Sequence, residues 1–280
     1  MQKLVRNMKI TFWERLKKRF LGTKTTSRVE DQVNSQIEDK IENQVAVVSP
    51  PQAQNTQNKD IVQSRRVDDM SAEAQLAIFL DAYLYARFPN ADSFRRIERM
   101  HSKTDQLAGV DVCFTGMDGT VYNVDEKAQL YYLNKDLPTF AFEIQFLRDG
   151  RVTTGWLCNN TLKTDLYLLI WPFATQDTPK GIRWDQFTKA DCLLIQKKRL
   201  LTMLERDGLA IKRMQQDAAQ FRKAGHIGKA TIDGVRGAYY FASDPKKYRE
   251  APINIVVTKD RLLSIAQRRY IVTREGVEVK

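Results

Sequence analysis

Five strand-like segments follow one another closely between residues 109 and 173, and this crowding constrains the fold more than any other feature of the sequence. They are rich in β-branched and aromatic residues and are separated by turn residues. They span residues 109–115, 120–131, 140–146, 153–159 and 165–173. Gly116-Met117-Asp118-Gly119 separates the first two segments and Asp149-Gly150 the third and fourth, as in β-hairpins. The sequence therefore predicts a mostly antiparallel sheet.

Helical patterns precede and follow these segments. Ser71 suits the N-cap of a helix that runs to about residue 88, where Pro89-Asn90 ends it, and a second short helix is predicted over 93–101. Further on, the pattern predicts a strand, a helix, two strands and a last helix, at 191–196, 197–206, 239–242, 253–258 and 258–269. Residues 209–230 fit either a helix or a surface arm. The predicted class is α/β (α+β), with a central mixed sheet flanked by helices.

The N-terminal quarter of the chain differs from the rest. The apolar spacing in residues 1–21 predicts a basic amphipathic helix that could contact a membrane surface, contact nucleic acid or dock on a partner. Alternatively, these residues form a poorly ordered leader. Residues 22–67 are rich in Gln, Asn, Ser and charge and predict a disordered linker. The folded domain is expected over residues 68–280.

Charge and cysteine content narrow the function classes. The net charge of +11 favours polyanionic partners, either nucleic acid such as DNA or a negatively charged membrane surface. The three cysteines include no CxxC pair, so a disulfide framework or a structural zinc site is not expected, and the chain is interpreted as cytoplasmic. We expect no transmembrane segment, because no apolar run reaches the required length. Walker, dinucleotide-binding, HExxH and GxSxG motifs are missing from the sequence.

The candidate chemistry lies in one hairpin, GVDVCFTGMDGTVYNVDEKAQL. Asp111 belongs to its first strand, and Asp125 and Lys127 belong to its second. Residues two apart in a strand point to the same face, so Asp125 and Lys127 share a face while Glu126 points away. Asp and Lys are depleted in strands, which makes this cluster informative.

Two carboxylates and a lysine in this arrangement suit phosphodiester hydrolysis. Asp111 and Asp125 offer the oxygen ligands that Mg²⁺ or Mn²⁺ takes, and a bound cation of this kind activates water. Lys127 can position that water or offset charge in the transition state.

The GVD…VDEKAQ pattern resembles the PD-(D/E)XK, or restriction-endonuclease-like, nuclease superfamily. Its aspartate corresponds to Asp111, its acidic residue to Asp125 and its lysine to Lys127, while Val110 replaces the proline. The resemblance covers about residues 70–175 and implies a core of a helix, a three-stranded antiparallel meander, a helix and a strand. It implies a Mg²⁺-dependent endodeoxyribonuclease acting on DNA, and it leaves open whether the protein is a homodimer.

Three further polar residues are candidates for the same site. Glu143 and Gln145 lie in the next predicted strand, where either can add a ligand or hold water. Glu73 lies in the first helix, from which superfamily members sometimes reach the metal. Each also fits an ordinary solvated position.

Two other functions remain open at this point. One is a nucleic-acid-binding protein of the same fold without catalysis. The other is a peripheral or partner-docking protein that works through residues 1–21.

Overall fold

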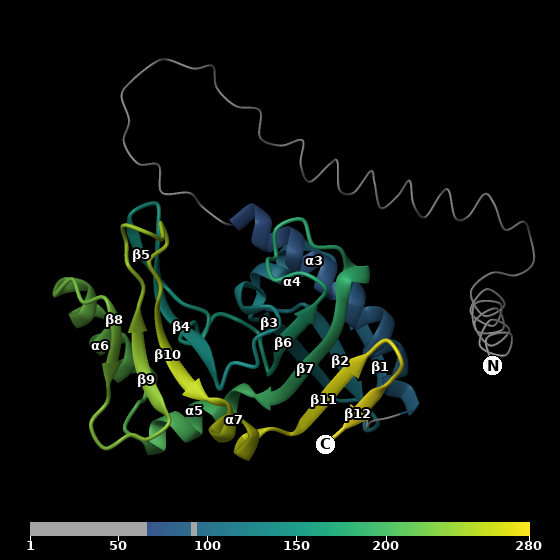
Figure 1. Ribbon diagram of the computed structural model, residues 1–280. Coiled ribbons are helices and arrows are strands. Elements are labelled where there is room, and N and C mark those ends of the chain that lie inside the picture. The colour runs from purple at the N-terminus through teal and green to yellow at the C-terminus, as the bar shows by residue number, and fades with distance from the viewer. Residues whose placement is uncertain (1–65, 91–93) are drawn as a thin grey trace, which may run out of the picture. The chain divides into compact units, whose positions relative to one another are not determined.

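The computed structural model describes residues 66–90 and 94–280 (Figure 1). The predicted basic segment 1–21 lies outside these ranges, as does the predicted linker except for its last two residues. The first described element is helix α3 (Arg66–Tyr83), which the 3₁₀ helix η1 (Tyr85–Asn90) follows. The helix predicted to begin at an N-cap Ser71 and to run to residue 88 therefore begins and ends earlier. Ser71 lies inside α3, and the predicted last turn is a separate 3₁₀ helix.

The strands form two sheets. The larger sheet has seven strands in the order β1-β2-β3-β6-β7-β11-β12. They are β1 (Phe94–Arg99), β2 (Val112–Gly116), β3 (Val121–Ala128), β6 (Leu166–Ala174), β7 (Phe187–Gln196), β11 (Arg268–Thr273) and β12 (Val277–Val279). The smaller sheet has five strands in the order β5-β4-β10-β9-β8. They are β4 (Thr139–Arg148), β5 (Arg151–Thr154), β8 (Gly228–Thr231), β9 (Ala238–Ala242) and β10 (Ile253–Thr258).

The larger sheet is mixed, because β3 pairs parallel with β6 while its other neighbouring strands pair antiparallel. The remaining helices are short. They are α4 (Lys103–Leu107), α5 (Lys197–Arg206), α6 (Ile211–Lys223), α7 (Lys259–Ile265), and the 3₁₀ helices η2 (Leu130–Tyr132) and η3 (Trp184–Gln186). The mixed α/β architecture with flanking helices agrees with the predicted class.

The five crowded strand segments correspond to β2 through β6, but they do not form one sheet. The third and fourth segments become β4 and β5 and belong to the smaller sheet. Between β3 and β6 the chain forms η2 and this hairpin, where the superfamily core has a helix. The expectation of a single central sheet was wrong, because strand pairing between distant segments decided sheet membership.

The helix predicted over 93–101 was also wrong. This stretch forms β1, an edge strand that pairs antiparallel with β2. Its Ile97 packs against the apolar core, while charged residues such as Arg95 and Arg96 are exposed. Their solvated side chains suit an edge strand, and the six-residue segment is too short to distinguish helical from strand periodicity.

Two apolar cores lie on opposite faces of the larger sheet. One face packs against α3 and η1 through residues such as Phe79 and Phe88. The other face packs against the smaller sheet, α5 and α7, and the same apolar core continues to α6, which contacts β4. Strand β6 contributes alternate residues to both cores, which explains its almost continuous apolar sequence LYLLIWPFA.

A buried ion-pair network joins the two sheets. Lys259, at the start of α7 and directly after β10, donates to Asp191 of β7 at 2.7 Å. Arg269 of β11 binds both oxygens of Asp191, at 2.9 and 2.7 Å. These cations outweigh the burial that opposes ionisation and lower the pKa of Asp191. The smaller sheet is therefore held against the larger one by charge as well as by apolar contact.

Two further observations bear on the predictions from composition. Within residues 66–90 and 94–280, no helix has the length and apolar content needed to span a membrane. Cys113, Cys158 and Cys192 are free thiols.

Gly109 lies just before β2, where the backbone adopts a positive φ and passes close to Thr164. Its φ is +73°, and a Cβ added there would lie 2.6 Å from the Thr164 hydroxyl oxygen. That hydroxyl donates to the Gly109 carbonyl at 2.9 Å. A side chain at this position therefore meets both a left-handed backbone and a steric clash.

We expect Gly109→Ala to lower the free energy of unfolding by about 2–4 kcal/mol, because it adds a clash to the cost of a positive φ. Gly150→Ala is the matched control, since Gly150 has the same φ of +73° and nothing within 4 Å of an added Cβ. It should cost only about 1 kcal/mol. Urea unfolding of both variants tests this, and equal losses would contradict the clash.

Candidate functional site

The candidate site is built on the β2–β3 hairpin. Its turn is held by Asp118, whose carboxylate accepts from the Thr120 amide at 2.9 Å and from the Thr120 hydroxyl at 2.8 Å. Gly119 supplies the positive φ, +86°, that the turn requires. In this register Val112 lies opposite Val124, and the Asp111 amide donates to the Val124 carbonyl at 2.9 Å. Asp111 and Asp125 are thereby neighbours across the hairpin.

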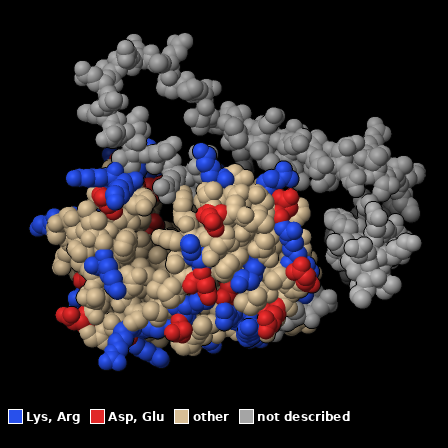
Figure 2. All heavy atoms as spheres, viewed as in Figure 1, with Lys and Arg blue, Asp and Glu red and all other residues tan. Residues whose placement is uncertain are grey.

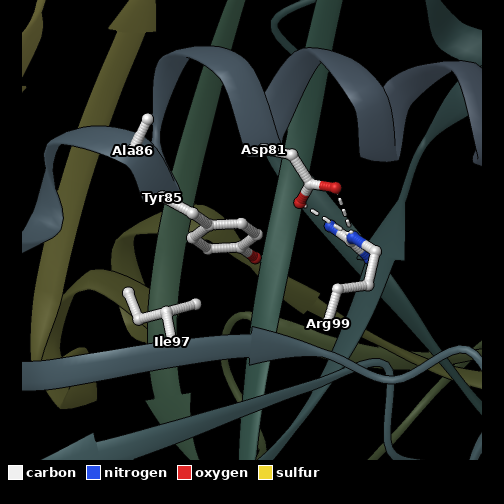
Figure 3. A pocket seen from close by; sticks show the side chains of 5 residues that line it. All are labelled: Asp81, Tyr85, Ala86, Ile97 and Arg99. Atoms are coloured by element: carbon white, nitrogen blue, oxygen red, sulfur yellow. Dashed lines mark hydrogen bonds and ion pairs between the residues drawn. The ribbon is translucent and has the colours of Figure 1, made fainter. Parts of the chain in front are cut away.

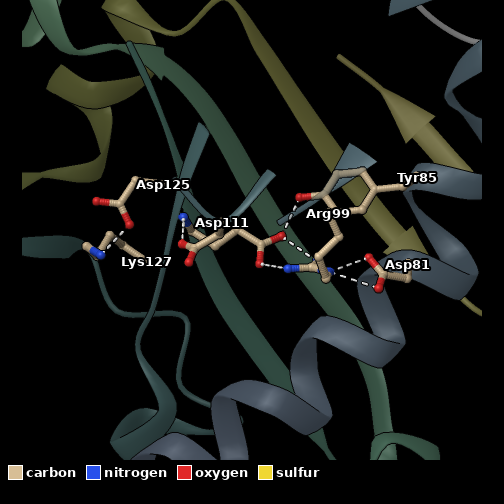
Figure 4. Close-up of polar contacts among 7 residues, drawn as sticks. Asp81, Tyr85, Arg99, Asp111, Asp125 and Lys127 are labelled. Carbon is tan, nitrogen blue, oxygen red and sulfur yellow. Dashed lines mark hydrogen bonds and ion pairs between the residues drawn. The ribbon is translucent and has the colours of Figure 1, made fainter. Parts of the chain in front are cut away.

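Alternation along β3 separates its three consecutive charges. Asp125 and Lys127 lie opposite Tyr167 and Leu169 of β6, on the face that packs toward the smaller sheet. Glu126 lies opposite Leu168, on the α3 side. Figure 4 shows Asp125 and Lys127 to one side of Asp111, and Arg99, Tyr85 and Asp81 to the other. The predicted sharing of a face by Asp125 and Lys127 is confirmed.

Two of the three predicted residues are in direct contact, and Asp111 lies beside them across the hairpin. The Lys127 ammonium is ion-paired with Oδ1 of Asp125. One carboxylate oxygen of Asp111, Oδ2, accepts from the Glu126 amide at 2.8 Å. The Lys127 ammonium also lies 5.3 Å from the centre of the Trp156 ring, a cation–π contact. The hairpin therefore brings Asp111, Asp125 and Lys127 to one place.

Burial makes this cluster electrostatically strained. Asp125 is only 2% exposed, and its Oδ2 has no hydrogen-bond partner among the described residues. Burial raises the pKa of Asp111 to about 6; Lys127 opposes this effect, and the Asp125 carboxylate adds to it. Burial alone would lower the pKa of Lys127, but Asp125 and Asp111 outweigh it and raise that pKa. Two acids thus compete for one cation.

Glu143 approaches the same lysine from the smaller sheet. Burial raises the pKa of Glu143 to about 7, against the opposing effects of Lys127 and of a hydrogen bond from the Trp156 amide. The expectation that its strand lies in the sheet of Asp125 was wrong, because β4 pairs with β5 and β10. The expectation that Glu143 acts at the same site as Asp125 stays a prediction, now across two sheets.

The two other candidates differ in their relation to the cluster. Glu73 on α3 is exposed, and its charge helps to raise the pKa of Lys127. Gln145 is 6% exposed, its Nε2 has no hydrogen-bond partner among the described residues, and it lies between Ile253 and Thr154 in the smaller sheet. No described hydrogen bond links Gln145 to Asp111, Asp125 or Lys127.

Two residues beside the cluster were missed by sequence reasoning. Tyr167 lies directly opposite Asp125 in the parallel β3–β6 pairing. Lys197 is the first residue of α5. Burial lowers the pKa of Lys197, although Asp125 opposes that effect, and its Nζ donates to the Asn159 carbonyl at 3.4 Å. Neither position follows a local motif, so only the pairing of distant strands could reveal them.

The opposite face of β3 carries a second polar group, which is fully paired. Arg99 of β1 donates to both oxygens of Glu126, at 2.8 and 3.0 Å, and to both oxygens of Asp81, at 2.8 Å. The Tyr85 hydroxyl also donates to Glu126. Asp81, Tyr85 and Arg99, with Ile97, line a cavity of about 290 Å³ (Figure 3). Because these charges satisfy one another, we interpret this group as the anchor that holds Glu126, and with it the amide bound to Asp111.

The ligand chemistry of the cluster fits a hard cation. Asp111 and Asp125 supply carboxylate oxygens, and the partnerless Oδ2 of Asp125 is suited to accept such an ion. Among the described residues, no three His, Cys, Asp or Glu side chains are grouped as a metal site. Magnesium commonly takes one or two carboxylates together with water and phosphate oxygens, so two carboxylates suffice for this chemistry.

Comparisons with protein-family models, with curated proteins and with solved structures found no match to this chain. The function of this chain is therefore inferred from the residues of the cluster themselves.

Without metal, the strain at Asp111 makes stability depend on pH. The folded pKa of about 6 lies above the ordinary value of 3.8, so the folded protein binds the proton more tightly than the unfolded chain. This contribution is complete below about pH 4 and is lost as the pH rises through about 6. Asn at position 111 keeps an acceptor for the Glu126 amide and carries no charge.

We therefore expect Asp111→Asn, in EDTA, to be about 1–2 kcal/mol more stable than the wild type near pH 8, with the gain vanishing near pH 4. Urea unfolding at both pH values measures the difference. Asp233→Asn, at an exposed position, is the control and should show no such trend. An equal gain in the free energy of unfolding at both pH values would contradict the interpretation that the ionised Asp111 carboxylate destabilises the folded protein.

Substitution of Arg99, which anchors Glu126 on the other face of β3, should cause a large loss of stability. Side chains of Arg99 and Glu126 are 15% and 11% exposed, so Arg99→Met leaves the poorly solvated Glu126 carboxylate without its cation. We expect a loss of about 3–5 kcal/mol in urea unfolding. Arg96→Met, on the same strand, removes an exposed pair with Glu98 and should cost at most about 1 kcal/mol. Similar losses for both variants would show that Glu126 does not depend on Arg99.

Proposed function

We propose that this chain is a divalent-metal-dependent nuclease that hydrolyses DNA phosphodiester bonds. The observation that carries the proposal is the convergence of Asp111, Asp125 and Lys127 on one face of the β2–β3 hairpin, with a buried Asp125 oxygen that has no hydrogen-bond partner among the described residues. Two acids and a lysine arranged in this way are the combination that the PD-(D/E)XK resemblance implies.

Each residue has a definable role in this reaction. Asp111 and Asp125 would hold the cation through their carboxylates. Bound Mg²⁺ or Mn²⁺ would polarise the scissile phosphate and acidify a bound water. Lys127 would direct its ammonium toward the attacking water or the charged transition state. Glu143, whose pKa of about 7 lies near neutrality, is suited to accept a proton from that water.

The charge of the chain supports an anionic substrate. The net charge of +11 favours association with DNA. Figure 2 shows lysine and arginine side chains spread over the visible face and interspersed with acidic ones. The basic side chains form no concentrated patch on this face. The net charge of the whole chain, rather than a local surface, is therefore what favours an anionic substrate. Cutting both strands of a duplex needs two sites, so a homodimer is part of this proposal.

A second candidate is a DNA-binding protein of the same kind without catalysis. The ion pair between Lys127 and Asp125 favours it, because each group already satisfies part of the other's charge. This alternative predicts salt-dependent binding of DNA with no metal-dependent cleavage.

Cleavage of supercoiled plasmid by the full chain separates the two candidates. We expect nicking or cutting with Mg²⁺ or Mn²⁺ and none in EDTA. Asp111→Asn and Lys127→Met should each lower the cleavage rate by about 100-fold or more, because each removes a charge that acts on the transition state.

Two exposed residues provide matched controls. Asp233→Asn and Lys198→Met remove the same charges away from the cluster and should leave cleavage near the wild-type rate. Circular dichroism should show that all four variants are folded. Cleavage that survives in both Asp111→Asn and Lys127→Met would remove the nuclease assignment, and metal-independent DNA binding without cleavage would favour the second candidate.

A further inference from the structure

Tyr167 has a buried hydroxyl that lacks a hydrogen-bond partner. The residue is 0% exposed, and no described group accepts from or donates to its oxygen. Buried tyrosine hydroxyls normally find a partner, because an unpaired one loses its bonds to water and gains nothing in return. Tyr85 and Tyr240 follow this rule, with Glu126 and Asp217 as their acceptors. Tyr167 therefore needs an explanation.

The position of Tyr167 associates it with the candidate site. It lies opposite Asp125 in the parallel β3–β6 pairing, so both side chains leave the same face of the sheet. Asp125 also has a buried oxygen without a hydrogen-bond partner in the part of the chain that the structure describes. The Asp125 charge contributes to the raised pKa of Tyr167, after the larger effect of burial. Two unsatisfied oxygens thus lie on neighbouring strands at the same level.

Packing restricts the tyrosine ring. Trp156 meets Tyr167 edge-on with ring centres 5.1 Å apart, and the Lys127 ammonium lies over the same Trp156 ring. Tyr167 also belongs to the apolar core between the two sheets, with Leu169 and Leu193. The hydroxyl cannot rotate out to solvent without disrupting this core, so a partner must come to it.

We propose that Tyr167 is a positioning residue whose hydroxyl hydrogen bonds to a water molecule in the hydration shell of the cation held by Asp125 and Asp111. Magnesium keeps several of its waters when it binds to a protein. Groups that hydrogen bond to the ligands of a metal commonly change its affinity by 10- to 100-fold. This inference rests on the proposed nuclease function, since it requires a cation at Asp125.

The test is Tyr167→Phe, which removes the hydroxyl and keeps the ring that packs against Trp156. In EDTA, the melting temperature of the full chain should stay equal to that of the wild type or rise, because an unsatisfied group is removed. When MgCl₂ or MnCl₂ is titrated at constant ionic strength, the concentration that gives half of the metal-induced shift in melting temperature should rise about tenfold. The metal concentration for half-maximal plasmid cleavage should rise in parallel.

Tyr240→Phe is the matched control. It removes a hydroxyl that donates to Asp217 at 2.8 Å, and Asp217 lies on α6. We expect its melting temperature in EDTA to fall by about 3–6 °C, and its metal titration to match that of the wild type. Tyr167→Phe should therefore change the metal titration but not lower the stability in EDTA, whereas Tyr240→Phe should lower the stability but not change the metal titration.

Two results would overturn the role of Tyr167. One is an unchanged half-saturating metal concentration in Tyr167→Phe. The other is a loss of stability in EDTA as large as that of Tyr240→Phe, which would mean that the hydroxyl is already satisfied without metal. If the wild type neither responds to metal nor cuts DNA, the proposed function fails and the role of Tyr167 fails with it. If the wild type responds and cuts while Tyr167→Phe behaves identically, only the role of Tyr167 is removed.

Discussion

Strand β3 carries three consecutive charged residues, Asp125, Glu126 and Lys127, through the middle of a seven-stranded sheet. Charges in such a position lose their hydration, so the folded state must supply partners on both faces. Much of the surrounding structure serves this requirement. The pairing with β2 brings Asp111 to one side of the strand, and the pairing with β6 closes the other side.

The two faces meet this requirement differently, and the difference distinguishes structure from candidate function. On the α3 side, Arg99 and Tyr85 satisfy both oxygens of Glu126. On the opposite side, two acids share one lysine, and an oxygen of Asp125 has no partner. A protein that needed only stability would gain from pairing this face as completely as the other. Unsatisfied, like-charged acids are instead the arrangement that a divalent cation relieves.

Several features followed from the sequence because their causes are local. The turn residues between 116 and 119 specify the hairpin, and the two-residue period of a strand requires Asp125 and Lys127 to share a face. The helical pattern also located α5, which spans Lys197–Arg206 as predicted. Residues 93–101 were mistaken for a helix, because a six-residue edge strand with charged flanks has too few apolar positions to show its period.

The sequence by itself determined the cluster of Asp111, Asp125 and Lys127, since a tight turn and strand alternation act over only a few residues. Only the tertiary structure decided that β4 joins a second sheet, that Glu143 approaches Lys127 from that sheet, and that Tyr167 lies beside Asp125. These outcomes depend on pairing between segments from about 40 to about 120 residues apart along the chain, and on two sheets packing face to face. Which distant strands pair depends on how much apolar surface the whole fold buries. The spacing of residues within one segment does not encode that total.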